Sequence, residues 1–127
     1  MVKLVILATA LSFAAPVACP AAELFGPDYP PCGDAPDSVA IVACVDAKAR
    51  AWDRRLNAAY AALQQRIDAE QRDPLRAAQR SWIQYRDANC RFYGSQSGSI
   101  RQVQAAECVR AMTQERTLEL EKAMKFE

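Results

Sequence analysis

The stretch QRSWIQYRDANC, residues 79–90, places residues that could do chemistry at helical spacing. Gln79, Trp82, Arg86 and Cys90 fall on one strip of a helix, so the Arg86 guanidinium can lie against the Trp82 indole as a cation–π contact. The whole sequence contains no histidine. The usual general base of catalysis near neutral pH is therefore missing, which excludes Ser-His and Cys-His nucleophile systems and histidine-based metal sites.

Carboxylates offer the remaining route to catalysis, because a pair of them can hydrolyse a glycoside. Asp53, Asp87 and Glu107 are the candidates that stand near apolar positions. We expect all three to pair with arginines instead, and nothing in their spacing requires a shared cleft. The sequence therefore predicts a protein that is not an enzyme, with no catalytic residues, no cofactor and no metal site.

Two arginines raise the question of where their charge is neutralised. Asp87 follows Arg86 directly, but adjacent helix residues diverge, so we expect Asp87 to pair with Arg91 or with an arginine of another helix. Arg116 stands in an apolar stripe, where a buried charge needs a partner. Asp87 and Asp53 are its candidate partners. Two interpretations stay open: a polar clamp that sets helix register, or a binding face centred on the tryptophan–arginine pair.

The N-terminus, residues 1–21, has the pattern of a cleavable secretory signal peptide. Lys3 is followed by an apolar run that is too short to span a membrane, and then by small residues. We expect cleavage after Ala21 and a periplasmic or secreted protein. The alternative is a lipoprotein acylated at Cys19, which we disfavour because Pro16 replaces the usual aliphatic residue of a lipobox.

The charge of the mature chain, residues 22–127, is balanced. Removal of Lys3 leaves 15 of the 16 basic residues, against 15 acidic ones. A nucleic-acid binder needs a basic excess, so this balance argues against that class of partner. No other segment is apolar enough to cross a membrane, so we expect no membrane span.

Four cysteines remain after the signal peptide leaves: Cys32, Cys44, Cys90 and Cys108. In an oxidising compartment they predict two disulfides, with three possible connectivities. We favour the pairs 32–44 and 90–108 because they close the shortest loops. The second pair requires either a climbing loop or a fourth helix that begins later than Ser99.

Proline and glycine divide the mature chain into an arm and a helical domain. Residues 22–37 hold four of the seven prolines and are expected to form an irregular arm. The domain, residues 38–127, begins with a short helix, and either Asp37 or Ser38 can be its N-cap. We expect a break near Val45, because Asp46 can cap a second helix.

Three longer helices follow, each with an apolar stripe at spacings of three and four residues. We expect the third helix to run from Pro74 to about Tyr93 and to end at a left-handed Gly94. The fourth should begin at a capping box, residues 99–102. The stripes are Ala49, Trp52, Leu56, Tyr60, Leu63 and Ile67; then Leu75, Ala78, Trp82, Tyr85, Asn89 and Phe92; then Val103, Ala106, Val109, Met112, Arg116, Leu120 and Ala123.

The predicted fold class is all-α. It is a small antiparallel bundle of three longer helices plus a short N-terminal helix, stapled by two disulfides.

These residues resemble the LprI-type lysozyme-inhibitor family of small secreted bacterial proteins. The family pattern is a cysteine pair, then D-x-x-L-N-x-x-Y, then L-x-x-x-Q-x-x-W-x-x-x-R-D-x-x-C, and a late cysteine followed by T-x-x-R-x-x-x-L. The match runs from Cys32 to Leu120. Besides the four cysteines and the leucines it includes Asp53, Asn57, Tyr60, Gln79, Trp82, Arg86, Asp87, Thr113 and Arg116.

The resemblance implies that the protein binds a lysozyme and blocks its cleft. The Gly-Ser loop, residues 94–99, could present hydroxyls and a guanidinium to the carboxylates of that cleft. The candidate binding residues are Trp82, Arg86, Arg91, Ser95, Ser97 and Arg101. Against this stands the balanced charge, because lysozymes are often strongly cationic and a partner of opposite charge associates faster.

The alternative is a periplasmic protein-interaction or envelope-stress module that binds another envelope protein and makes no lysozyme contact. A module of that kind is expected to expose an apolar patch larger than a few hundred Å².

Overall fold

The computed structural model describes residues 30–126. The expected signal peptide, its cleavage site and Cys19 lie outside the described residues, as does the arm up to residue 29. The helices are α1 (Pro30–Gly33), α2 (Ser38–Arg66), α3 (Ala69–Gly94) and α4 (Arg101–Ala123), and the described range contains no strand. The predicted all-α fold class is confirmed, and α1 adds one helical turn where the sequence indicated only an irregular arm.

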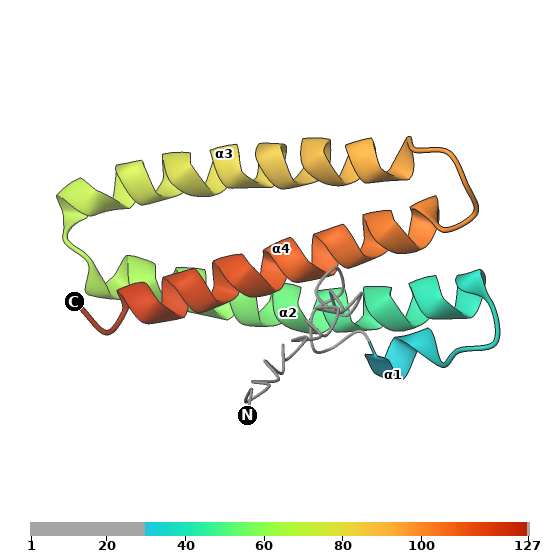
Figure 1. The fold of residues 1–127 in the computed structure, drawn as a ribbon. Coiled ribbons are helices and arrows are strands. Elements are labelled where there is room, and N and C mark those ends of the chain that lie inside the picture. Colours follow the sequence, from blue (N-terminus) through green and yellow to red (C-terminus); the bar gives the residue numbers. More distant parts are fainter. Residues whose placement is uncertain (1–29, 127) are drawn as a thin grey trace, which may run out of the picture.

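The central element of the bundle is α4. It packs extensively against α2 and also against α3, whereas α2 and α3 have little direct contact with each other (Figure 1). The three long helices are connected by short turns and run antiparallel to their neighbours along the chain (Figure 1). Within residues 30–126, no helix combines the length and the apolarity that a membrane span requires.

The first long helix, α2, is continuous, so the predicted break near Val45 is wrong. Its start is as expected: the Asp37 carboxylate accepts a hydrogen bond from the backbone N–H of Ala40 at 2.8 Å. Val45 is fully buried. Asp46 is an internal residue of α2, and its exposure is intermediate. Burial of the apolar positions on both sides of the potential cap keeps the helix intact, because tertiary packing outweighs a local capping preference.

The turn between α2 and α3 lies earlier than predicted. The chain turns at Ile67, which is buried and extended, and α3 begins after Asp68. The backbone N–H of Asp68 donates to Oε1 of Gln71 at 2.9 Å, which satisfies one group at the helix start. Pro74 therefore lies inside α3, on its exposed side. Pro74 is the sixth residue of α3, so it removes the hydrogen bond that an N–H at this position would donate to the carbonyl of Glu70.

The turn between α3 and α4 also differs from the prediction. Gly94 ends α3 without a positive φ, and the glycine that adopts the left-handed region is Gly98, with φ of 102°. No capping box forms, because α4 begins at Arg101 after an N-cap at Ile100 that makes no side-chain hydrogen bond. The later start shortens the stagger between Cys90 and its partner on α4.

Both predicted disulfides are present. The Cα atoms are 5.5 Å apart in the Cys32–Cys44 pair and 5.5 Å apart in the Cys90–Cys108 pair. The first joins α1 to α2, and the second joins the end of α3 to α4. In the chain-entropy model each disulfide raises the free energy of unfolding by about 3 kcal/mol, which is a large contribution for a domain of this size.

The apolar core consists of two clusters. The larger one joins α2 to the end of α4, with Leu75 and Trp82 of α3 packed against it; its buried members are Leu56, Ala59, Leu63, Ile67 and Leu120. The smaller one contains Cys32, Val45 and Ala106 and surrounds the first disulfide.

The stripe predicted on α3 is only partly buried. Tyr85 and Phe92 are 63% and 60% exposed, and Ala78 is exposed as well. The buried residues of α3 are Gln79 and Cys90. Because α3 rests mainly on one helix, it buries a narrower strip than its apolar spacing indicates.

Candidate functional site

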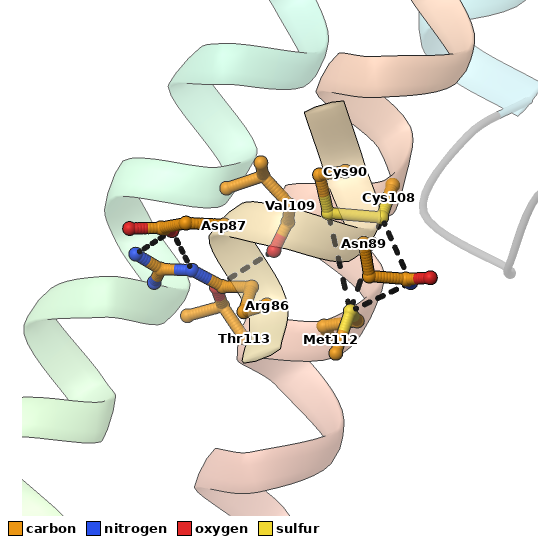
Figure 2. Close-up of a disulfide and its surroundings, with 8 residues drawn as sticks. All are labelled: Arg86, Asp87, Asn89, Cys90, Cys108, Val109, Met112 and Thr113. Carbon is orange, nitrogen blue, oxygen red and sulfur yellow. Dashed lines mark hydrogen bonds and ion pairs between the residues drawn. A yellow bond between two sulfur atoms is a disulfide. The ribbon is translucent and has the colours of Figure 1, made fainter. Parts of the chain in front are cut away.

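The second disulfide anchors the end of α3 to α4 near the loop that contains the candidate binding residues. Figure 2 shows the amide of Asn89 turned toward this disulfide and toward Met112. Asn89 Nδ2 lies 3.6 Å from Cys108 Sγ and 3.4 Å from Met112 Sδ. The sulfur-rich contact and the covalent bond hold the two helices together one turn before the loop.

The tryptophan–arginine pair forms as predicted. The guanidinium carbon of Arg86 lies 5.0 Å from the centroid of the Trp82 ring. The partner of Asp87 is not as predicted, because Arg86 Nε and Nη2 donate to Asp87 Oδ1 at 3.0 and 2.9 Å. The long arginine side chain bends toward its neighbour, and Figure 2 shows the two on the same side of α3. Arg86 keeps only 17% of its side chain exposed, so its charge serves mainly intramolecular contacts.

Arg116 is buried and paired, but with other partners than predicted. Its Nε donates to Oε1 of Gln79 at 3.0 Å, and its Nη1 lies 2.8 Å from Oε2 of Glu119. Neither Asp87 nor Asp53 is its partner. The bond to Gln79 joins α3 to α4, which supports the interpretation as a polar clamp that sets helix register.

The other motif residues make contacts within their own helix. Asn57 Nδ2 donates to Asp53 Oδ2 at 3.2 Å, and Gln64 Nε2 donates to the Tyr60 hydroxyl at 2.7 Å. The hydroxyl of Thr113, which is almost completely buried, donates to the backbone carbonyl four residues earlier at 2.6 Å. Every polar residue of the family pattern thus has an intramolecular partner, so the pattern describes the scaffold more than an exposed site.

A buried ion pair on α4 identifies the arginine partner of Glu107, which the sequence analysis did not name. Arg110 Nε and Nη2 donate to the two carboxylate oxygens of Glu107 at 2.7 and 2.5 Å, and the side chains are 1% and 3% exposed. Arg110 Nη1 also donates to Gln114 Oε1. The expectation that Glu107 pairs with an arginine is confirmed. The spacings of three and four residues were the available signal, because such residues share a helix face.

A second tryptophan–arginine contact lies on α2, and its arginine also forms an ion pair with α4. Arg55 lies 4.8 Å from the Trp52 ring centroid, and its Nε and Nη2 donate to Glu121 at 2.5 and 2.7 Å. The hydrogen bond from Arg55 holds the pKa of Glu121 below its usual value. The same bond raises the pKa of Arg55, so the pair is charged at neutral pH.

An open cleft of about 930 Å³ lies at the loop end of the bundle. Its floor is the face of α4 that carries Ala105, Ala106 and Val109. Asp46 of α2 and Asp87 of α3 line it as well, each from a different helix.

Four of the candidate binding residues gather at this end of the molecule. Arg91 and Ser95 line the cleft, and Ser97 and Arg101 are exposed on and just after the loop. Trp82 and Arg86 do not line the cleft themselves, although Arg86 bonds to Asp87, which does. A smaller pocket of about 420 Å³ opens between α3 and α4 and has Ile100 and Met112 in its lining.

The sequence is similar to known proteins over most of its length. A model of the family described as Lysozyme inhibitor LprI matches residues 32–120. An uncharacterized protein of Rhizobium meliloti is 33% identical over 110 residues, which covers 75% of this chain and 79% of that protein. No solved structure matches. Because the family model matches well over half of the chain and includes both disulfides, the chain belongs to the LprI lysozyme-inhibitor family.

Proposed function

We propose that this protein is a secreted or periplasmic inhibitor that binds a lysozyme and blocks its substrate cleft. The observation that carries the proposal is the family match over residues 32–120. The export of the chain is supported by the signal-like residues 1–21 and by two disulfides, which persist in oxidising compartments. The lysozyme-facing surface that we propose is the loop end, with Arg91, Ser95, Ser97 and Arg101.

The loop is suited to insertion because it is short and anchored on both sides. The Cys90–Cys108 bond ties the two helices beneath it. The Ser95 hydroxyl donates to the Phe92 carbonyl at 2.7 Å, and the Ser95 N–H bonds to the Arg91 carbonyl at 3.0 Å. An element that is ordered before binding loses less conformational entropy when it binds.

The chemistry of the loop end complements a glycosidase cleft. Such clefts contain a pair of carboxylic acids that flank the scissile bond. Arg101 is exposed at the start of α4 and can donate two parallel hydrogen bonds to a carboxylate. Ser97, four residues earlier on the loop, is also exposed and can donate one more from its hydroxyl. Occupation of the acids by these donors would exclude substrate.

The proposal is tested with the oxidised protein, residues 22–127, titrated into cell-wall hydrolysis by c-type, g-type and i-type lysozymes. Saturable inhibition of one type is the expected result. Circular dichroism and a thiol assay first establish that the sample is helical and free of thiols. The absence of inhibition at tens of micromolar from such a sample would contradict the proposal for these targets.

A second candidate function is an envelope interaction module without lysozyme contact. The observation that favours it is the apolar surface at the same end of the bundle, where Phe92 is 60% and Ile100 is 49% exposed. Exposed apolar surface around a pocket is typical of protein-binding sites. Crosslinking in periplasmic extract distinguishes the two functions, because the module would capture a partner other than a lysozyme.

A further inference from the structure

The cleft beside the loop has a different chemistry from the loop itself. Ala105, Ala106 and Val109 form a small-residue apolar floor along α4, and Val42 of α2 adds to it. An apolar surface of this kind can accept the methylene stem of a long side chain. The loop, in contrast, offers hydroxyls, and the guanidinium groups of Arg91 and Arg101 flank it.

Two carboxylates line this floor from different helices. Asp46 belongs to α2 and Asp87 to α3. Within residues 30–126, the Asp46 side chain forms no hydrogen bond or ion pair, although it is of intermediate exposure. Both bonds from Arg86 reach only Oδ1 of Asp87, and half of the Asp87 side chain stays exposed. Each carboxylate therefore has capacity for a further donor.

We infer that this cleft receives a lysine or arginine side chain of a cationic lysozyme, with its stem on the apolar floor and its charged head beside Asp46 and Asp87. The inference rests on the proposed function and names the second half of the same interface. Charge complementarity carries it, because an inserted cation would be met by two carboxylates while its methylene groups leave water.

The arrangement gives the R-D pair of the family pattern a role in binding. Trp82 packs against the larger core cluster and holds the guanidinium of Arg86. Arg86 in turn holds Oδ1 of Asp87, which sets the carboxylate at the side of the cleft. Trp82 and Arg86 are thus positioning residues, and Asp87 is the group that touches the partner.

The charges at this end also orient the partner. Arg91 lines the cleft on the side of the loop, and Arg101 follows beyond it. The loop side is therefore basic and suits the acids of a lysozyme cleft, whereas the two aspartates suit basic residues at its edge. Because its net charge is balanced, the protein gains little association rate from long-range attraction to a cationic partner. Local charges of alternating sign can still favour one orientation of the bound lysozyme over others.

The test measures binding to a cationic lysozyme that the wild-type protein inhibits. Asp46→Lys reverses one charge of the cleft, and Asp46→Asn removes it with almost no change of shape. Glu115→Lys is the matched control, because Glu115 is exposed on α4 and does not line the cleft. We expect Asp46→Lys to raise Kd by at least about tenfold and Asp46→Asn by a smaller factor, whereas the control stays within about twofold.

A positioning variant provides an independent readout. Arg86→Lys keeps the charge but removes the planar contact to the indole, so the Asp87 carboxylate is held less firmly. We expect weaker lysozyme binding with an unchanged circular dichroism spectrum. The affinity of wild type should also fall with added salt, and Asp46→Asn should show a smaller salt dependence.

The outcomes separate this inference from the proposed function. If wild type inhibits a lysozyme and both Asp46 variants bind as tightly as wild type, the inference is overturned and the inhibitor function stands. If wild type binds no lysozyme, both are overturned. Asp46→Asn decides the matter if Asp46→Lys does not fold.

Discussion

The Nε of Arg116 on α4 lies 3.0 Å from the Oε1 of Gln79 on α3, and both residues are 9% exposed. This bond crosses the contact between two helices that are also joined by the Cys90–Cys108 disulfide and by the Asn89 amide, which contacts Met112. A buried guanidinium accepts few alternative positions, because any displacement would leave donors unpaired. The pair therefore sets how far α3 can slide along α4.

Gln79→Ala is expected to destabilise the protein by about 2 kcal/mol, because a hydrogen bond to a charged buried group is lost. Urea unfolding followed by circular dichroism measures the change. Gln84→Ala, at an exposed position of the same helix, serves as the control and should lie within about 0.5 kcal/mol of wild type. Equal stability of the two variants would contradict the clamp.

Glu107→Ala is expected to cost about 3 kcal/mol or more, because the buried Arg110 loses its carboxylate. The double variant Glu107→Leu with Arg110→Met should recover most of that loss, since it replaces the ion pair by apolar groups of similar volume. Chemical denaturation of wild type and both variants provides the comparison. A double variant that is less stable than the single one would show that the charges themselves are needed.

The Arg55–Glu121 pair predicts a pH dependence of stability. The pKa of Glu121 is lowered by Arg55 in the folded state, so the unfolded state binds the proton more readily. The stabilisation is fully present above the ordinary value of 4.5 and is lost as pH falls through the lowered folded pKa. Glu121→Gln should therefore differ from wild type most at neutral pH, and the difference should shrink below pH 4.5. Thermal melts between pH 3 and 7 would measure it, and a constant difference would refute the prediction.

The two disulfides are expected to differ in their effect on binding. Replacing either pair by serine should destabilise the domain by about 3 kcal/mol. Only removal of Cys90–Cys108 should also weaken lysozyme inhibition at temperatures where both variants are folded, because this bond anchors the loop between α3 and α4. Removal of Cys32–Cys44 provides the control, since it joins α1 to α2.

Arg101→Ala is expected to raise the concentration needed for half-maximal inhibition by about tenfold, because arginines at the centre of an interface carry much of its binding energy. Arg80→Ala removes the same charge from the exposed side of α3 and should change inhibition by less than about twofold. Equal losses in both variants would indicate that net charge, and not the loop end, controls binding.

Much of the scaffold was predictable because its signals are local. Apolar spacing of three and four residues indicated each long helix, and the carboxylate of Asp37 was a sufficient start signal for α2. Counting cysteines and comparing loop lengths led to both disulfides. The contact of Arg86 with Trp82 followed from one helical turn of separation.

Other features depend on what each residue meets in space. The break near Val45 does not occur because burial on both sides of Asp46 outweighs the capping signal. Tyr85 stays exposed because α3 has one principal neighbour, a fact that no spacing within α3 contains.

The sequence by itself determined an all-helical, doubly crosslinked chain and its family pattern, because helical periodicity and cysteine count act over short distances. Only the tertiary structure decided that Arg116 bonds to Gln79 and that Asp46 and Asp87 line one cleft. Such pairings depend on the packing of helices that are far apart in sequence. Their geometry is set by the burial of whole faces and not by any local spacing.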